Sequence, residues 1–190
     1  EEVCEISKPR YQNSKMHVEV FGEFFQRPLQ LELKILGEKQ AENAALAALA
    51  AKILLPEIPE TEIERGLGRT SLEGRFEERD NVILDGAHTP ASVEQALDTL
   101  NELYPNQKHH LLFSSVAGKD LKHIVPQFRG KFEKVYLTVP GSTKDVDIEE
   151  LKQIFRENEI EFTASEDYEQ IIKTALEDTA ANEKLLAIGS

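Results

Sequence analysis

The sequence predicts an α/β protein in which a mostly parallel sheet is covered by helices on both faces. The main observation is that short apolar segments alternate with amphipathic helical segments from about residue 71 to residue 190. This alternation is typical of parallel strands that are joined by crossover helices. Residues 1–70 show a different pattern, with two alternating apolar-polar segments and one long alanine-rich segment, and we therefore predict a domain boundary near residue 70.

Within residues 1–70, the segments 16–25 and 29–36 alternate apolar and polar residues with a period of two. This period predicts two antiparallel strands, each with one buried face. The alanine- and leucine-rich segment predicts a helix from Lys39 to Leu54, which the prolines of "PEIPE" end. The segment "TEIERGL" could add one or two helical turns, and we interpret "GLGRTSLEG" (residues 66–74), with its three glycines, as a linker.

After the linker, apolar strands and helices follow one another. We expect strands at residues 81–85, 109–116, 134–139, 160–164 and 184–190, and helices at residues 89–104, 120–128, 146–158 and 165–178. Thr89 can cap the first of these helices, with Pro90 in its first turn. Ser165 is expected to open the last helix, and Asp147 and Glu150 have the spacing of a capping box.

Composition and charge exclude several classes of partner. The net charge is −13 and no cluster of Lys and Arg forms a basic face, which argues against nucleic acid and against an anionic membrane surface. The longest apolar segment, residues 44–51, is too short to span a bilayer, and no signal-peptide pattern opens the chain. Cys4 is the only cysteine, which fits a reducing cytoplasm. We expect a cytoplasmic monomer, and we interpret the chain, which starts without Met and ends on a strand-like segment, as a fragment of a longer protein.

The segment "VILDGAHTP" (residues 82–90) is the strongest functional signal. Asp85 and Gly86 follow a buried strand, and His88 precedes a helix. Ligands of open α/β sheets bind at the carboxyl ends of the strands. At this place, Asp85 could accept hydrogen bonds from sugar hydroxyls or lie near a metal. His88 could donate a hydrogen bond to a carboxylate or a phosphate. The alternative that both side chains only satisfy backbone groups of the turn stays open. The sequence contains no glycine-rich phosphate loop.

The histidines do not predict a metal site. His109 and His110 are adjacent at the start of a strand, so their side chains should point to opposite faces of the sheet. They cannot easily ligate one ion together with His123, and we expect no metal in this chain.

Three segments, "GEKQAENAALAALAA", "GLGRTSLEGRFE" and "VILDGAHTPASVEQAL", in this order and at these spacings, resemble folylpolyglutamate synthase and dihydrofolate synthase of the Mur ligase superfamily. The resemblance implies an ATP-dependent ligase that joins L-glutamate to folate or dihydropteroate through an acyl phosphate. Residues 1–70 would be the C-terminal part of the central ATPase domain plus a linker, and residues 71–190 a Rossmann-like C-terminal domain. The phosphate loop and the Mg²⁺ ligands would lie upstream of Glu1, so the fragment alone would be inactive.

The resemblance also implies residue roles. Asn43, Arg75 and Asp85 would contact ATP: Asn43 near the adenine, Arg75 at the phosphates and Asp85 at the ribose hydroxyls. The alternative for Asn43 is a solvent-facing helix residue, and the alternative for Arg75 is a surface arginine. Cell-wall amide ligases of the superfamily usually have Tyr where Gly86 stands, which favours the folate branch.

On the glutamate side, the resemblance implies His88, Lys119 and Ser190. Lys119 could instead be solvated, and Ser190 could be only part of a loop. The sequence departs from the family at Thr89, where Asn is usual, and at Lys39, where His is frequent. The family also tends to have an acid at the position of Gly118.

Two further functions stay open. The first is a non-catalytic nucleotide- or ligand-binding module of the same fold, and the second is a cell-wall Mur-type amide ligase. A glycine-rich phosphate loop upstream of this sequence would favour an enzyme over a binding module.

Overall fold

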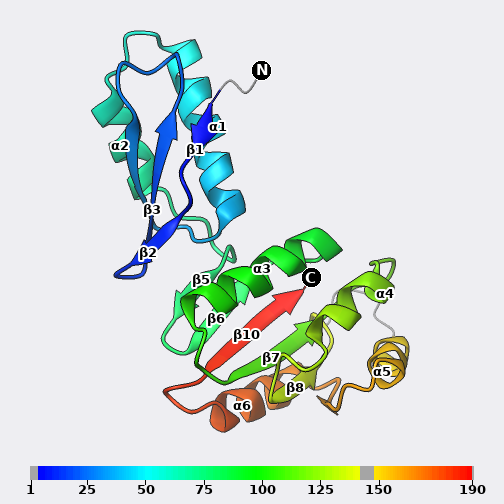
Figure 1. Ribbon diagram of the computed structural model, residues 1–190. Helices are drawn as coiled ribbons and strands as arrows, with labels where there is room; N and C mark the ends of the chain where they lie inside the picture. The colour runs from blue at the N-terminus through cyan, green and yellow to red at the C-terminus, as the bar shows by residue number, and fades with distance from the viewer. Residues whose placement is uncertain (1–3, 142–147, 190) are drawn as a thin grey trace. The chain divides into compact units, whose positions relative to one another are not determined.

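The computed structural model describes residues 4–141 and 148–189. The chain divides into two compact units, Glu1–Glu73 and Gly74–Ser190. Figure 1 shows a small antiparallel sheet with two helices in the first unit and a larger sheet in the second. Within the described residues, no helix combines the length and the apolar character that crossing a membrane requires.

The sheet of the first unit is built around β3 (Lys15–Phe21), which pairs antiparallel with β1 (Glu5–Ile6), β2 (Arg10–Gln12) and β4 (Leu29–Leu33). The alternation predicted for β3 and β4 is confirmed, because Met16, Val18 and Val20 are buried and stand opposite Leu33, Leu31 and Leu29. The alanine-rich helix is confirmed as α1 (Glu38–Leu54).

The interpretation of residues 66–69 as a linker is wrong, because α2 (Glu60–Arg69) continues through both glycines. Packing explains one of the two glycines, Gly68. A Cβ on Gly68 would lie 3.0 Å from the carbonyl oxygen of Glu32 on β4, so the helix approaches the strand closely at this point. The helix is also held to the segment before β4 by Glu64, which accepts two hydrogen bonds from Arg27 at 2.6 and 2.9 Å.

The second unit is a six-stranded sheet in the order β5-β6-β10-β7-β8-β9. Its strands are β5 (Glu77–Arg79), β6 (Val82–Asp85), β7 (His109–Ser114), β8 (Lys134–Leu137), β9 (Thr163–Ala164) and β10 (Lys184–Gly189). Among these strands of the described residues, β5 alone is antiparallel to its neighbour. The mostly parallel sheet is therefore confirmed, and Figure 1 shows β10, the last strand of the chain, between β6 and β7.

Helices cover both faces of this sheet, as predicted. They are α3 (Pro90–Leu103), α4 (Leu121–Ile124) with the 3₁₀ turn η1 (Val125–Phe128), α5 (Ile148–Glu157) and α6 (Tyr168–Asp178). On one face, the ring of Phe113 packs against Phe128 of η1 and Phe155 of α5, with centroids 5.2 and 5.8 Å apart. On the opposite face, Ile171 and Ala175 of α6 pack with Tyr136 and Leu185.

Two details of the second unit differ from the sequence expectation. The cap of α6 is Asp167 and not Ser165, because the Asp167 side chain accepts a hydrogen bond from the Gln170 N–H at 3.0 Å. The Ser165 hydroxyl instead accepts a hydrogen bond from the N–H of Asp167. β9 has two residues where the sequence predicted five. The capping box expected at Asp147 lies outside the described residues.

Candidate functional site

Asp85, at the carboxyl end of β6, holds the turn that follows the strand. Its Oδ1 accepts the Ala87 N–H and its Oδ2 accepts the Phe76 N–H, both at 2.7 Å. Burial raises the pKa of Asp85, while the two N–H donors and the nearby Arg75 charge oppose this rise. The side chain is therefore first of all a structural element of the turn, and each oxygen keeps one lone pair for a further donor.

The backbone donors of the turn are already used within the protein. The Gly86 N–H donates to the carbonyl of Gly74 at 2.8 Å, and the N–H groups of His88 and Thr89 donate to the Ser92 hydroxyl at 3.1 and 3.0 Å. Thr89 caps α3 as predicted, since its hydroxyl accepts the Ser92 N–H at 3.2 Å. A ligand at this turn would therefore meet side-chain groups rather than a cradle of free amides.

Arg75 lies beside this turn. A Cβ built on Gly86 would lie 2.8 Å from Nη1 of Arg75, so the glycine leaves the space that the guanidinium occupies. The positive charge of the same guanidinium offsets part of the rise that burial causes in the pKa of the Asp85 carboxyl group. Arg75 itself is exposed. The structure thus brings Arg75 and Asp85 together, with a cation that can still turn toward a ligand.

His88 is half-buried, and its ring is oriented by the turn. Nδ1 lies 2.8 Å from the carbonyl oxygen of Gly86. Because a carbonyl oxygen only accepts, Nδ1 must carry the hydrogen of this bond. In the neutral ring, Nε2 then keeps a free lone pair, which can accept a hydrogen bond from a ligand.

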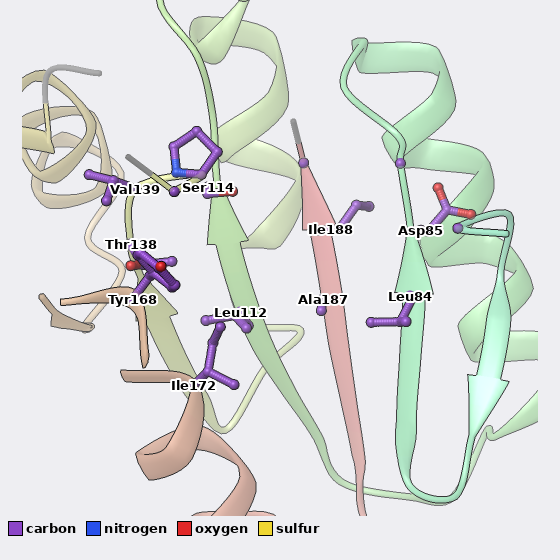
Figure 2. A pocket seen from close by; sticks show the side chains of 15 residues that line it. Leu84, Asp85, Leu112, Ser114, Thr138, Val139, Tyr168, Ile172, Ala187 and Ile188 are labelled. Atoms are coloured by element: carbon purple, nitrogen blue, oxygen red, sulfur yellow. The ribbon is translucent and has the colours of Figure 1, made fainter. Parts of the chain in front are cut away.

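A cleft of about 520 Å³ lies at the carboxyl ends of β6, β10, β7 and β8. Figure 2 shows its apolar side, where Leu84, Ala187 and Leu112 come from three neighbouring strands and Ile172 of α6 lies beside Leu112. Asp85 and Thr138 contribute polar groups to its lining. An apolar cleft with a few polar groups at the carboxyl edge of a parallel sheet is the usual place for a ligand in an α/β protein.

Gly189 allows β10 and β7 to approach each other at this edge. It has a φ of 126°, and a Cβ there would lie only 1.9 Å from the carbonyl oxygen of Ser114. No residue with a side chain fits without moving the backbone. Gly189 was not among the predicted site residues, although a glycine at a strand end was the available signal.

The other predicted residues belong to other segments of the chain. Asn43 is exposed on α1 in the first unit, where its Nδ2 donates to Gln40 Oε1 at 3.2 Å and where it lines an apolar cleft of about 220 Å³ with Leu33 and Leu67. Lys119 is half-buried in the segment between β7 and α4 and does not line the cleft at the strand ends. Ser190 lies outside the described residues.

Comparison with known protein families identifies residues 68–190 as the domain described as "Mur ligase, glutamate ligase domain". The chain belongs to the Mur ligase family. The resemblance to folylpolyglutamate synthases is confirmed by curated relatives of this Mur ligase chain. The chain is 28% identical over 169 residues to a dihydrofolate synthase/folylpolyglutamate synthase of Bacillus subtilis, and these residues cover 84% of this chain and 38% of the relative.

A probable bifunctional folylpolyglutamate synthase/dihydropteroate synthase of Haloferax volcanii is 35% identical over 95 residues, which cover 48% of the Mur ligase chain and 11% of the relative. Among solved structures, folylpolyglutamate synthase of Mycobacterium tuberculosis complexed with ADP has a TM-score of 0.88 at 21% identity, over 99% of this chain and 45% of that one. The folylpolyglutamate synthase of Thermotoga maritima has a TM-score of 0.80 at 23% identity, over 100% of this chain and 44% of that one. This Mur ligase chain therefore shares their fold and spans less than half of their length.

Proposed function

We propose that this chain is part of an ATP-dependent ligase that adds L-glutamate to folate or dihydropteroate through an acyl phosphate. Residues 1–70 would be the end of the central ATPase domain with its linker, and residues 71–190 the C-terminal domain. The observation that supports the proposal most is the turn after β6, where Asp85, Arg75 and His88 lie around Gly86 at the carboxyl edge of a Mur ligase sheet. The chain's homologues are folylpolyglutamate synthases, and one of them was solved with ADP and AMPPCP.

We assign the nucleotide to Asn43, Arg75 and Asp85. Arg75 is exposed and always charged, so it can turn toward phosphate oxygens and stabilise the charge of the phosphoryl group as it is transferred. Asp85 can accept ribose hydroxyls with the lone pairs that its two backbone donors leave free. Asn43 would serve the adenine end.

We assign the glutamate to His88, Lys119 and Ser190. Nε2 of His88 is the acceptor that the bond from Nδ1 to Gly86 leaves available, and it suits an N–H of the incoming amino group. Lys119 follows β7 at the carboxyl edge of the sheet, where an ammonium group suits a carboxylate of the amino acid.

The turn does not suit the Mg²⁺ ion that accompanies ATP. Mg²⁺ is bound by carboxylates with free oxygens, whereas both oxygens of Asp85 already accept backbone N–H groups and the Arg75 cation lies beside them. We therefore place the Mg²⁺ ligands outside this chain, and we expect the chain alone to hydrolyse no ATP. We further propose that the protein is a cytoplasmic monomer, which its single, unpaired cysteine, Cys4, suits.

Steady-state kinetics of the full-length protein that carries this sequence, with ATP and glutamate varied separately, test the proposal. Arg75→Ala should lower kcat about ten- to a hundredfold, because the loss of a hydrogen bond to a charged group costs about 1.5–3 kcal/mol. His88→Ala should raise the KM for glutamate and leave the KM for ATP nearly unchanged. Arg79→Ala, which removes an exposed arginine of β5 from a surface ion pair with Glu77, is the matched control and should change neither constant. If the Arg75 and His88 variants equal the control, the assignment of this site is wrong.

The main alternative is a non-catalytic binding module of the same fold. The internally satisfied backbone of the turn favours it, because the turn offers no free amides to phosphates. Ligase turnover by the full-length protein decides between the two functions, and the choice of acceptor, folate or a cell-wall precursor, distinguishes the folate branch from a cell-wall Mur-type amide ligase.

A further inference from the structure

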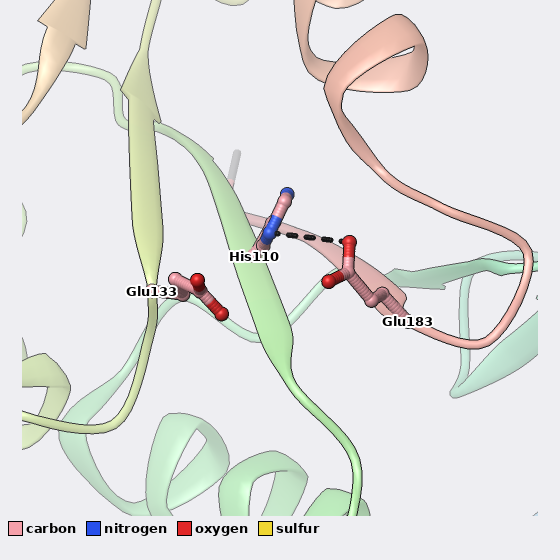
Figure 3. A group of neighbouring side chains, drawn as sticks. All are labelled: His110, Glu133 and Glu183. Atoms are coloured by element: carbon pink, nitrogen blue, oxygen red, sulfur yellow. Dashed lines mark ion pairs between the residues drawn. The ribbon is translucent and has the colours of Figure 1, made fainter.

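Three potential metal ligands meet at the amino ends of β7, β8 and β10, at the edge of the sheet opposite the cleft. His110 is the second residue of β7, and Glu133 and Glu183 directly precede β8 and β10. One ligand atom of each residue lies within 4.8 Å of the others. Figure 3 shows the three side chains around the start of β7, with Glu183 facing the imidazole of His110.

The hydrogen bonds of His110 define which ring nitrogen is free. The side chain is buried, with 2% of the residue exposed, and Nδ1 lies 3.1 Å from the hydroxyl oxygen of Thr179. The Thr179 hydroxyl donates its hydrogen to the carbonyl of Ala175 at 2.7 Å. Its oxygen must therefore accept the hydrogen that Nδ1 of His110 carries. In the neutral ring, Nε2 therefore carries a lone pair.

This lone pair faces groups that also only accept. Nε2 lies 3.6 Å from Oε2 of Glu183, which is too long for a hydrogen bond. It is close to the roughly 3.4 Å that separates two ligands of a tetrahedral zinc ion with bonds of about 2.0–2.1 Å. Nε2 thus faces the Glu183 carboxylate at a separation that suits two ligands of one ion, and a carboxylate oxygen of Glu133 lies within 4.8 Å.

The surrounding contacts hold two of the ligands and leave the third adjustable. Oε2 of Glu183 accepts the Ala180 N–H at 3.0 Å, and the Glu183 N–H donates back to the Ala180 carbonyl at 2.9 Å, which orients the carboxylate. Glu133 pairs with Lys108 at 2.9 Å in an exposed ion pair. Such surface pairs contribute little, so Glu133 can exchange Lys108 for a stronger cation.

We propose that His110, Glu133 and Glu183 bind a divalent transition-metal ion such as Zn²⁺, with water completing the coordination. One imidazole nitrogen and two carboxylates suit Zn²⁺ better than Mg²⁺, which prefers oxygen ligands in an octahedron. The ion would join three neighbouring strands at their amino ends and stabilise the second unit. The hydrogen bond from Nδ1 to the Thr179 hydroxyl orients the ring of His110, as a hydrogen bond to the other ring nitrogen usually does for a histidine that binds a metal.

Calorimetric titration of the metal-free 190-residue chain with ZnCl₂, together with thermal unfolding, tests the site. We expect saturation near one equivalent and a higher Tm with Zn²⁺, but no change in Tm with the same concentration of MgCl₂. Co²⁺ should give the visible absorption bands of a tetrahedral site. No saturable binding near one equivalent would overturn the proposal.

Variants locate the ion. Glu183→Gln and Glu133→Gln preserve the shape of each side chain, and each should weaken Zn²⁺ binding at least about tenfold. His123→Gln is the matched control, because His123 also contacts a carboxylate, Asp120 at 2.7 Å, but on the exposed surface. Unchanged affinity in both glutamate variants, or loss of binding in the control, would contradict the site. This readout is metal binding and is independent of the proposed ligase activity.

Discussion

The carboxylate of Asp85 fixes the backbone of Phe76, whose N–H donates to Oδ2 at 2.7 Å. Phe76 has a φ of 44°, in the left-handed region that non-glycine residues seldom adopt, and its side chain is buried. The bond therefore ties the segment that carries Arg75 to the end of β6. The position of Arg75, which we propose for the phosphates, thus depends on Asp85, which we propose for the ribose hydroxyls.

The first prediction concerns this bond. Asp85→Ala leaves the N–H groups of Phe76 and Ala87 without their acceptor, so the free energy of unfolding should fall by about 1–3 kcal/mol for each group that water cannot reach. Urea denaturation of the 190-residue chain measures this loss. Asp98→Ala, which removes an exposed carboxylate of α3, is the control and should stay within about 0.5 kcal/mol of the parent sequence. Equal losses in the two variants would contradict the structural role of Asp85.

The second prediction separates the two roles of His88. In His88→Asn, the side-chain amide can replace Nδ1 as donor to the Gly86 carbonyl, but nothing replaces Nε2. If His88 binds glutamate, the asparagine variant of the full-length protein should unfold like the parent and yet show a higher KM for glutamate. A variant with unchanged stability and unchanged KM would show that His88 serves only the turn.

The third prediction concerns the approach of β10 to β7. Gly189→Ala places a Cβ 1.9 Å from the Ser114 carbonyl oxygen and should cost more than about 3 kcal/mol, because backbone must move. Gly130→Ala is the matched control, since Gly130 has a φ of 68° and open space around it. It should cost only the roughly 1–2 kcal/mol of the left-handed conformation. A similar loss of stability in both variants would mean that the close approach contributes nothing.

The fourth prediction concerns pH. The hydrogen bonds from Arg27 lower the pKa of Glu64 below its ordinary value of 4.5. A lowered pKa stabilises the folded state above pH 4.5, and this contribution is lost as the pH falls through the folded-state pKa. Glu64→Gln should therefore lower stability at neutral pH, and the difference from the parent should shrink in acid.

Acid unfolding of both chains, followed by circular dichroism, measures this difference. Glu62→Gln, on the same helix but in an exposed pair with Arg65, is the control and should change little at any pH. A Glu64→Gln difference that stays constant from neutral pH down through acid would refute the assignment.

The fifth prediction is that residues 74–190 fold without the first unit. This segment forms one compact unit with helices on both faces of its sheet, which is enough for its own core. A chain of these residues should show a cooperative thermal transition. A gradual loss of structure on heating would be the contrary result.

Sequence pattern and composition were sufficient to predict two strands of the first sheet and five of the second, whereas the short strands β1, β2 and β5 were not predicted. β3, β4 and α3 have strong patterns, α1 is rich in alanine and leucine, and Thr89 caps α3 as its residue type indicates. α2 was predicted too short because two glycines lower helix propensity, whereas the close packing of Gly68 on β4 requires one of them. Local pattern carries no information about such a tertiary contact.

The candidate site was predictable only in part. The motif placed Asp85 at a strand end, but its bonds to Phe76 and Ala87 depend on a backbone path that residue types do not specify. The adjacency of Arg75 to Gly86 likewise appears only in the fold. His110 and Glu183 are far apart in the sequence and meet because β10 pairs with β7, so an argument from neighbouring histidines could not find them.

The position of β10 between β6 and β7 has a consequence for biosynthesis. Leu185 pairs with Val82 and His110, so the centre of the sheet closes only after its last strand has been made. On the ribosome, a chain that ends before Lys184 carries two strands with facing, unpaired edges, which are sites for aggregation. Long-range closure of this kind is slow, so the second unit should complete its fold only after these residues leave the exit tunnel, and its β6 and β7 edges are the surfaces that a chaperone would need to protect.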